Sequence, residues 1–330
     1  MEATKDSQPE FVYCQSVIAA CRAEIQKRLI GQDGLIDGML AACIAGGHVL
    51  LEGVPGLAKT LAAQTFAQSA GLSVSRIQFT PDLLPADVTG TLIYEQGRGT
   101  FTVRKGPLFA HIVLADEINR APAKVQSAML EAMAERQVTI GDDTYQLPDP
   151  FFVVATQNPI EQDGTYNLPE AELDRFLLKI VLTYPSTAAE RAIVKTMGTA
   201  STVPVTSVLT EADIRRCRHL VRQVVCDDAI IDYIVSIIGV TRPEDTAPQS
   251  THDITRYITF GASPRAGIAL LLCAKARALM AGRGYVLPED VKAMAAPVLR
   301  HRLVLSYEAA ADAVSADYII EKILAVIPVP

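Results

Sequence analysis

The stretch GVPGLAKT, from Gly53 to Thr60, nearly matches the phosphate-binding pattern G-x-x-x-x-G-K-[ST], except that Ala58 stands where the pattern has its second glycine. Such loops bind an anion because successive backbone N–H groups at the start of a helix point at it, with the helix dipole behind them. Gly53 follows an apolar run and Gly56 lies in mid-loop. Glycine is therefore kept at both positions where we expect the backbone to be constrained.

The alanine decides between a nucleotide site and a glycine-rich turn that happens to contain a lysine. Ala58 directly precedes Lys59, where we expect the backbone to be helical already, so that one added methyl group costs little. The strand-like run before the loop and the helical pattern after it favour the nucleotide site. The candidate binding residues are Gly53, Val54, Pro55, Gly56, Leu57, Ala58, Lys59, Thr60 and Leu61.

Two adjacent carboxylates, Asp116 and Glu117, end the apolar run IVLADE. Burying unpaired charge costs several kcal/mol, so carboxylates at the end of a buried strand indicate chemistry more than packing. Beside a phosphate loop, Asp116 can face a Mg²⁺ ion held by Thr60, and Glu117 can polarise a water molecule for attack on a γ-phosphate. The alternative is a solvated strand end.

Five short apolar runs must position these residues. They are nearly continuous in Val, Ile and Leu, as is typical of a parallel sheet covered on both faces. Strands separated by helical patterns indicate an α/β fold with right-handed crossovers. The predicted strands are HVLLEG (48–53), VSRIQF (74–79), HIVLADE (111–117), FFVVAT (151–156) and KIVLTY (179–184).

Two stretches, 88–107 and 138–148, each hold two β-leaning runs around a glycine-containing turn. They read as hairpins inserted into the α/β domain, and each is equally consistent with a surface ornament.

After Pro185 the character of the chain changes. The segments that follow are helix-like and lie at 187–199, 210–222, 226–240, 264–282, 288–301 and 315–327. We therefore predict an α/β nucleotide-binding domain over residues 1–185, with a flexible tail over 1–10, and an all-helical lid domain over 186–330. Pro185 is a candidate hinge between them.

Arg265 stands where a cation is unfavourable. In GASPRAG, Ser263 reads as a helix N-cap and Pro264 as the first helical residue, which places Arg265 in the first turn. A positive charge there opposes the helix dipole at a cost of about 0.3–1 kcal/mol. An anionic partner explains this placement, either the phosphates of a bound nucleotide or a nearby carboxylate.

The phosphate loop, the paired carboxylates and QNP after the next predicted strand resemble the AAA+ ATPases. The fuller wording GVPGLAKT…LADEINRAPAKVQSAMLEAMAERQVT…ATQNP…EAELDRF…GASPRA resembles the MoxR family. This resemblance runs from about Leu29 to the C-terminal helices, and GVPGLAKT is similar to a usual loop variant of that family. It implies a P-loop AAA+ core with a parallel sheet and two hairpins, followed by a helical lid.

The resemblance also implies roles near the nucleotide. Asn158 matches the position called sensor 1, where a carboxamide could orient the attacking water, although Asn158-Pro159 could also be a simple turn. Gln32 matches the segment that lines the adenine pocket, with Leu29 and Ile30 as apolar contacts to the base.

Three arginines match positions that act on the phosphates. Arg175 in ELDRF matches the arginine finger, which reaches the nucleotide of a neighbouring subunit and can raise turnover by roughly 10³–10⁵. An ordinary surface pair of Arg175 with Asp174 is the alternative. Arg120 in EINRA is a second candidate for a contact across the interface, and Arg265 matches sensor 2, which brings the lid onto the phosphates.

Composition excludes some classes. The formal charge of −7 over 330 residues argues against a broad electrostatic surface for duplex nucleic acid. The polar start MEATKDSQPE and the short apolar runs predict no signal peptide and no membrane insertion. Six scattered cysteines without a C-x-x-C pair read as free thiols of a cytoplasmic protein, and the five histidines show no metal-ligand spacing.

The resemblance implies an ATP-hydrolysing chaperone-like motor, acting as a ring, by expectation a hexamer, that remodels a protein client. The client could carry a von Willebrand factor A domain, and the cofactors would be ATP and Mg²⁺. Three alternatives stay open. These are a metal-chelatase motor subunit, a nucleic-acid motor that uses the hairpins, and a module that binds ATP as an assembly signal without significant turnover. The acidic hairpin tip Gly141-Asp142-Asp143 and the few aromatic residues of the other hairpin disfavour the nucleic-acid motor.

Overall fold

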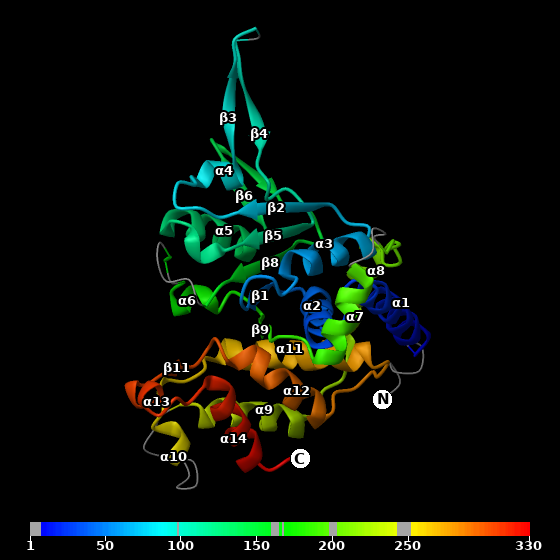
Figure 1. Ribbon diagram of the computed structural model, residues 1–330, viewed down its shortest axis with the longest axis vertical. Helices are drawn as coiled ribbons and strands as arrows, with labels where there is room; N and C mark the ends of the chain where they lie inside the picture. Colours follow the sequence, from blue (N-terminus) through cyan, green and yellow to red (C-terminus); the bar gives the residue numbers. More distant parts are fainter. Residues whose placement is uncertain (1–7, 98, 160–164, 167, 198–202, 243–251) are drawn as a thin grey trace.

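The computed structural model describes residues 8–97, 99–159, 165–166, 168–197, 203–242 and 252–330. Its centre is a five-stranded sheet with the order β2-β5-β8-β1-β9, in which all neighbouring strands run parallel (Figure 1). All five predicted strands are confirmed. They are β1 (Val49–Glu52), β2 (Val74–Gln78), β5 (Ile112–Asp116), β8 (Phe152–Gln157) and β9 (Leu178–Val181).

The two faces of the sheet bury their side chains in different cores, because successive residues of a strand point in opposite directions. Val49 and Leu51 of β1 belong to a core shared with α1 (Gln8–Gln26), α2 (Asp33–Ala45) and α3 (Lys59–Ser69). Leu50 between them belongs to a second core formed with α5 (Ala123–Glu135). In the central strands β1, β5 and β8, the continuous apolar runs thus reflect burial on both faces.

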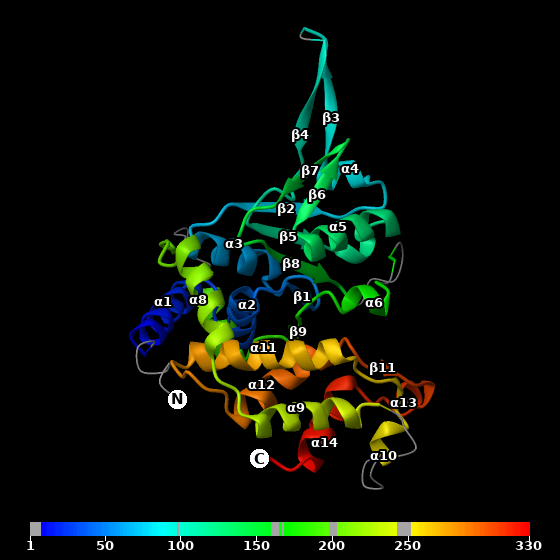
Figure 2. The same cartoon turned by 180° about the vertical axis from the view of Figure 1, so that it is seen from behind.

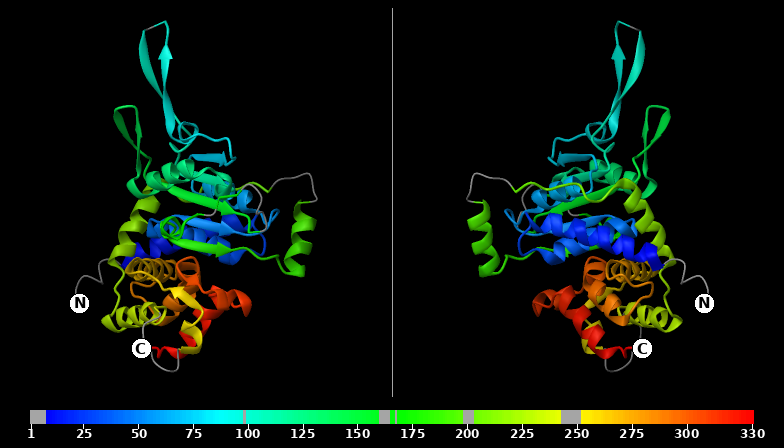
Figure 3. Two further views of the ribbon diagram at one scale, coloured as in Figure 1. Left: turned by 90° about the vertical axis from the view of Figure 1, so that its left-hand side faces the viewer. Right: turned by 90° about the vertical axis from the view of Figure 1, so that its right-hand side faces the viewer.

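Both predicted hairpins are present beside the sheet. The first, β3 (Gly90–Glu95) and β4 (Thr100–Lys105), follows α4 (Pro85–Thr89) and projects far from the body of the molecule (Figures 1 and 3). The second, β6 (Gln137–Ile140) and β7 (Asp143–Gln146), is shorter and supports the first, since a Cβ atom at Gly141 would lie 2.7 Å from Leu92 Cδ1.

The base of the long hairpin is a close crossing of two glycines. A Cβ atom at Gly106 would lie 2.6 Å from the backbone nitrogen of Gly90 and 2.4 Å from the backbone oxygen of Val88. Gly90 itself has a φ of +107°. Glycine is therefore required on both strands where the hairpin leaves the domain.

The C-terminal part of the chain is largely helical, as predicted. Its longer helices are α7 (Thr187–Met197), α8 (Glu211–Gln223), α9 (Asp228–Val240), α11 (Pro264–Met280), α12 (Pro288–Leu299) and α14 (Ala316–Val326). Its shorter helices are α10 (His252–Thr255) and α13 (Tyr307–Ala311), whereas the four-residue helix α6 (Glu170–Leu173) precedes β9. Helix α11 packs against α2, α8, α9 and α12, so it joins the lid to the helical layer of the core (Figure 2).

Two details of the prediction are wrong. The lid is not all-helical, because β10 (Ile258–Phe260) and β11 (Val304–Leu305) form a small antiparallel sheet in it. Strands of two or three residues are too short to show a periodic pattern. The flexible tail predicted over 1–10 is also too long, since Gln8 already begins α1, and residues 1–7 lie outside the described residues.

Within the described ranges, no helix combines the length and the apolar character that crossing a membrane requires.

Candidate functional site

The phosphate loop connects β1 to α3 through two residues with positive φ. Gly56 has a φ of +88°, with open space where a Cβ would point, and Ala58 has a φ of +58° at the N-cap of α3. The helical backbone predicted for Ala58 is therefore wrong. The chain enters α3 by a left-handed turn one residue later than expected, and alanine in that conformation costs about 1–2 kcal/mol.

Gly53 is needed for a different reason from the one predicted. A Cβ atom there would lie 2.9 Å from Leu182 Cβ and 3.2 Å from the Leu182 carbonyl oxygen. Glycine at this position lets the loop leave β1 while packed against the chain that follows β9. Leu57 is buried in the core, Val54 and Leu61 pack against it, and Pro55 is exposed. The apolar loop residues anchor the turn.

Lys59 lies across the mouth of the loop. Its Nζ donates to the Gly53 carbonyl oxygen at 2.7 Å and to the Gln157 carbonyl oxygen at 3.4 Å. These contacts join the loop to the end of β8. The ammonium group is thus held at the carboxyl edge of the sheet, where a phosphate could replace the backbone oxygens.

Asp116 ends β5 at the same edge and is nearly buried, with 8% of its surface exposed. Thr60 Oγ1 lies 3.4 Å from its Oδ2, and Thr156 Oγ1 donates to its Oδ1 at 2.6 Å. Arg76 on β2 donates to Oδ2 from Nη2 at 2.7 Å. Asp116 and Thr60 are brought together as predicted, and Arg76 and Thr156 are additional partners.

Glu117 follows with a φ of +59°, which turns its side chain out of the strand direction. Its backbone nitrogen donates to Thr156 Oγ1 at 2.9 Å, and its Oε2 accepts from Gln78 Nε2 at 2.8 Å. Arg120 Nε lies 3.1 Å from the same Oε2. Within one chain, Arg120 therefore pairs with Glu117.

Asn158 lies directly after β8, the strand between β5 and β1, and is 4% exposed. It follows the strand beside that of Asp116, as the sequence predicted, and its role near the nucleotide stays a prediction.

The predicted adenine segment lies at the start of α2. Leu29 is buried in the core with 2% of its surface exposed, so its side chain leaves little room for contact with a base. Ile30 is half-buried, and Gln32 Nε2 lies 3.4 Å from the Thr183 carbonyl oxygen. A Cβ atom at Gly31 would lie 2.5 Å from Ala189 Cβ on α7, which brings that helix against the segment.

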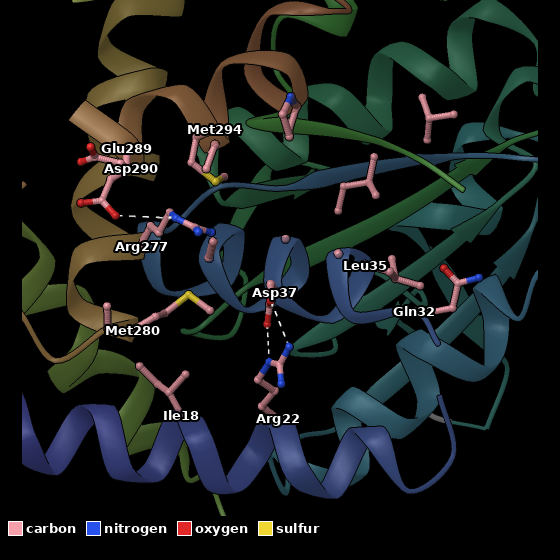
Figure 4. Close-up of a pocket in the computed structure, with 18 of the residues that line it drawn as sticks. Ile18, Arg22, Gln32, Leu35, Asp37, Arg277, Met280, Glu289, Asp290 and Met294 are labelled. Atoms are coloured by element: carbon pink, nitrogen blue, oxygen red, sulfur yellow. Dashed lines mark hydrogen bonds and ion pairs between the residues drawn. The ribbon is translucent and has the colours of Figure 1, made fainter. Parts of the chain in front are cut away.

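A cavity of about 740 Å³ opens beside this segment, between α2 and the lid helices. Gln32 and Leu35 line one end of it, and Met280, Asp290 and Met294 line the other (Figure 4). The Gln32 end adjoins Leu182, which also touches Gly53 of the phosphate loop. A base joined to phosphates on the loop could therefore enter this end.

Arg175 and Arg265 lie at the opposite end of the strands. Leu177 N donates to the His48 carbonyl oxygen at 2.8 Å, which places the segment before β9 beside the start of β1. Arg175 is exposed, and its Nη1 donates to the Leu130 carbonyl oxygen at 3.3 Å. Arg265, with 79% of its side chain exposed, lies 3.7 Å from Asp174 Oδ2.

The lid arginine predicted to reach the phosphates is thus not brought to its own phosphate loop. It pairs with a carboxylate, the alternative that the sequence left open. Arg302, with only 4% of its side chain exposed, holds the other oxygen of Asp174 at 2.6 Å. Arg175 and Arg265 line one cleft of about 230 Å³.

The residues at the carboxyl edge fit a magnesium nucleotide. Thr60 and Asp116 offer oxygen donors, which Mg²⁺ prefers, and such ions are usually bound through one or two carboxylates together with substrate phosphates. The described part of the chain has no group of three or more His, Cys, Asp and Glu side chains placed for another metal.

Three residues of the site escaped the sequence interpretation, namely Arg76, Gln78 and Thr156. Arg76 and Gln78 alternate in VSRIQF with the buried Ile77 and Phe79. This alternation indicates a polar face on β2, and it could have identified Arg76 and Gln78 as candidate site residues.

A parallel sheet with a lysine-bearing loop, a buried aspartate and a following glutamate at its carboxyl edge defines a P-loop ATPase. Residues 48–178 match the family described as ATPase family associated with various cellular activities (AAA), and residues 251–323 match an AAA lid domain.

Relatives that match most of the chain identify the family of ATPases more closely. Chaperone MoxR1 of Mycobacterium tuberculosis is 48% identical over 308 residues, which cover 93% of this chain and 81% of that protein. Protein MoxR of Methylorubrum extorquens is 32% identical, with 86% of each chain covered. A crystal structure of a protein from Cytophaga hutchinsonii matches all of both chains with a TM-score of 0.91 and 44% identity. The chain belongs to the MoxR family of AAA ATPases.

Proposed function

We propose that this protein is a chaperone-like AAA+ motor of MoxR type that hydrolyses ATP to remodel a protein client. The observation that carries the proposal is the meeting of Lys59, Asp116 and Glu117 at one edge of the sheet. Family membership and the relatives named as chaperones support it.

The proposed roles follow from donor chemistry. Lys59 and the backbone N–H groups of the loop from Gly53 to Leu61, except at Pro55, bind the phosphates, and Asn158 orients the attacking water. Glu117 accepts a proton from that water as general base. Gln32 and Ile30 contact the base, with Leu29 behind them in the core.

Thr60 and Asp116 would hold Mg²⁺ through their oxygen atoms. When bound, the ion neutralises charge on the β- and γ-phosphate oxygens. The protein contributes the position of these two side chains, which Thr156 stabilises through its hydrogen bond to Asp116.

We further propose that a complete catalytic site needs two subunits. Each chain carries the phosphate loop at the carboxyl ends of the strands and exposed guanidinium groups, Arg175 and Arg265, at the amino ends. A head-to-tail ring, by expectation a hexamer, would bring these two edges together. Arg175 would then stabilise charge on the neighbour's γ-phosphate, with Arg120 as the alternative.

The long hairpin is the proposed contact to a protein client. Tyr94 and Phe101 pack against each other near its tip in a tilted arrangement, with ring centroids 5.2 Å apart and exposed fractions of 52% and 66%. Lys105, one of its basic residues, lies over the rings of Phe109 and Tyr145 instead of facing outward. Exposed apolar groups fit a protein surface better than a phosphate backbone.

The client could be a protein with a von Willebrand factor A domain, and the setting proposed is the cytoplasm. We also propose the division of the chain near Pro185 into a nucleotide-binding domain (1–185) and a lid (186–330), with Pro185 as a hinge.

The proposal is tested by the substitution Glu117→Gln, measured as ATP turnover and ATP binding at high protein concentration. The variant should bind Mg²⁺-ATP like the unmodified protein and lose turnover by about 10²–10⁴-fold, since a carboxamide cannot accept the proton. Glu131→Gln, on the exposed side of α5, is the matched control and should retain full turnover. Absence of turnover in the unmodified, ATP-saturated protein would instead favour a module that uses ATP as an assembly signal.

A further inference from the structure

A buried guanidinium group of the lid is bonded to the segment that carries Arg175. Arg302 follows the end of α12, and only 4% of its side chain is exposed. Its Nε donates to Asp174 Oδ1 at 2.6 Å, and its Nη2 donates to the Asp174 carbonyl oxygen at 3.1 Å and to that of Phe176 at 2.7 Å. These two carbonyl groups belong to the residues on either side of Arg175, so Arg302 holds the backbone there.

The remaining donors of Arg302 join this segment to the lid. Its Nη1 donates to the carbonyl oxygen of Leu177 at 3.2 Å and to that of Val298 on α12. A guanidinium group has five N–H donors, and four of them find acceptors in residues 174–177 while the fifth finds one in α12. Separation of the segment from the lid would leave buried donors and acceptors without partners, which is costly.

The neighbouring His301 holds the same segment. Its Nε2 lies 3.0 Å from the Phe176 carbonyl oxygen. Burial lowers the pKa of His301, so the ring is neutral, and Nε2 must carry the proton because a carbonyl oxygen can only accept. The Phe176 side chain is fully buried in the core formed with α5. The residue after Arg175 is thus fixed by the lid and by the α/β domain together.

The Arg175 side chain between these anchors is weakly held. It is exposed, and its Nη1 donates to the Leu130 carbonyl oxygen at 3.3 Å, which is longer than usual. The reach of its guanidinium group therefore depends mainly on the backbone that Arg302 fixes. For a group that must meet a phosphate of another chain, a displacement of about 1 Å can lower the rate by roughly 10²-fold.

We propose that Arg302 is a positioning residue for Arg175 and makes the placement of this arginine follow the lid of its own subunit. Because Arg302 bonds α12 and residues 174–177 at once, a shift of the lid carries the segment with it. A nucleotide held between α2 and the lid of one subunit would in this way adjust the arginine offered to the next subunit. The inference rests on the proposed function, in which Arg175 acts across the interface.

The proposal is tested by Arg302→Lys, measured alone and combined with Arg175→Ala. Lysine keeps a positive charge beside Asp174, but an ammonium group with three donors cannot bond all the acceptors of residues 174–177. The kcat for ATP should fall by about 10–100-fold, and KM should stay unchanged because the phosphate loop lies at the other end of the sheet. The double variant should be no slower than Arg175→Ala alone, since there is then no guanidinium group to position.

The matched control is Arg218→Lys. Arg218 is also largely buried, with 13% of its side chain exposed, and it also donates to a carbonyl oxygen, that of Cys43 at 3.0 Å, and to a carboxylate, Asp149 Oδ1 at 3.1 Å. These bonds join α8 to α2 and to the chain before β8, so the control should keep the turnover of the unmodified protein. Urea unfolding of both variants measures their loss of stability separately from turnover.

Mixing of subunits shows on which side of the interface the defect lies. Arg302→Lys mixed with Glu117→Gln should recover about a quarter of the unmodified turnover, since an intact base and a well-placed arginine meet at about a quarter of the interfaces. Arg302→Lys mixed with Arg175→Ala should recover no turnover beyond that of the two variants alone, because neither chain supplies a well-placed arginine.

Three results would overturn the proposal. These are an Arg302→Lys variant with the kcat of the control, a double variant in which the two losses multiply, and recovery with Arg175→Ala in place of Glu117→Gln. If Arg302→Lys does not fold, His301→Leu decides. It removes one bond to Phe176 and should lower kcat several-fold with the same mixing pattern, so normal turnover would exclude the coupling.

Failure of the proposed function gives a different result. The unmodified protein would then show no turnover, or Glu117→Gln and Arg175→Ala would fail to restore turnover to each other although their subunits exchange.

Discussion

At the scale of single residues, Ala58 carries a conformation that glycine adopts more easily. Its φ of +58° lies in the left-handed region, directly before the lysine of the phosphate loop. The usual pattern has glycine at this point, which agrees with that geometry.

We therefore expect Ala58→Gly to preserve nucleotide binding and to stabilise the chain slightly. Relief of left-handed strain, about 1–2 kcal/mol, exceeds the extra entropy that glycine has in the unfolded chain, about 0.4–1 kcal/mol. The free energy of unfolding from urea titration should rise by up to about 1 kcal/mol. Gln64→Gly, at an exposed position inside α3, is the matched control and should lose about 1 kcal/mol. Equal losses in both variants would contradict the left-handed assignment.

The sequence predicted the residues of the site that stand in motifs, from Gly53 to Leu61 and at Asp116 and Glu117, and the structure brings these together. It did not reveal Arg76 and Gln78, because their partners depend on β2 lying beside β5, and strand order cannot be read from periodicity. It left open whether Arg265 meets phosphates or a carboxylate, and within its own chain Arg265 pairs with Asp174. A local motif identifies the residue, but it does not determine at which end of the sheet the lid helix that carries this residue lies.

At the scale of secondary-structure elements, continuous apolar runs were enough to predict the five strands. The central strands β1, β5 and β8 are buried on both faces, whereas the edge strands β2 and β9 bury only part of their residues. The β10–β11 pair was missed because two or three residues carry no period.

The buried His48, which directly precedes β1, forms hydrogen bonds to β8 and α5. Its Nδ1 accepts from the Val153 backbone nitrogen of β8 at 3.0 Å, and its Nε2 donates to the Met133 carbonyl oxygen of α5 at 3.2 Å. The ring that precedes β1 is therefore neutral, because Nδ1 must keep its lone pair. Burial lowers the pKa of His48 from 6.5 to about 4.

This pKa predicts a loss of stability in acid. A group whose folded pKa is depressed contributes its full stability above its unfolded pKa of 6.5 and loses it as the pH falls toward about 4. For His48 the loss is about 3 kcal/mol. Burial also lowers the pKa of His301, which adds in the same direction.

The measurement is the free energy of unfolding across this pH range for the unmodified protein and for His48→Asn. The variant should be less stable at neutral pH and should lose less stability in acid. His219→Gln, which changes an exposed histidine, is the control. The same acid loss in His48→Asn and in the unmodified protein would show that His48 does not titrate as described.

At the scale of the whole molecule, the candidate site is divided between the two ends of the sheet. Lys59 follows the carboxyl end of β1, whereas Arg175 and Arg265 lie beside its amino end. A strand rises about 3.3 Å per residue, so these groups cannot meet within one chain across the four residues of β1.

Mixing two inactive variants tests whether the two parts of the candidate site, from opposite ends of the sheet, meet between neighbouring chains. Glu117→Gln has no general base but keeps its arginine, and Arg175→Ala keeps its base but lacks the arginine. In randomly mixed rings, about a quarter of the interfaces combine an intact base with an intact arginine. Turnover should therefore recover to about a quarter of that of the unmodified protein. No recovery despite exchange of subunits would exclude Arg175 as the residue acting between subunits and leave Arg120 as the candidate.

The glycine crossing at the base of the long hairpin separates positions that tolerate no side chain from positions that tolerate substitution. Side chains cannot be introduced at Gly90 or Gly106 without displacing the opposite backbone, so the way in which the hairpin joins the domain is fixed. Beyond this crossing, Ile93, Tyr94 and Phe101 are exposed and belong to neither core, so they can be exchanged without disturbing either core. The same body can therefore present a different exposed surface on its hairpin after a few substitutions, while both of its cores stay unaltered.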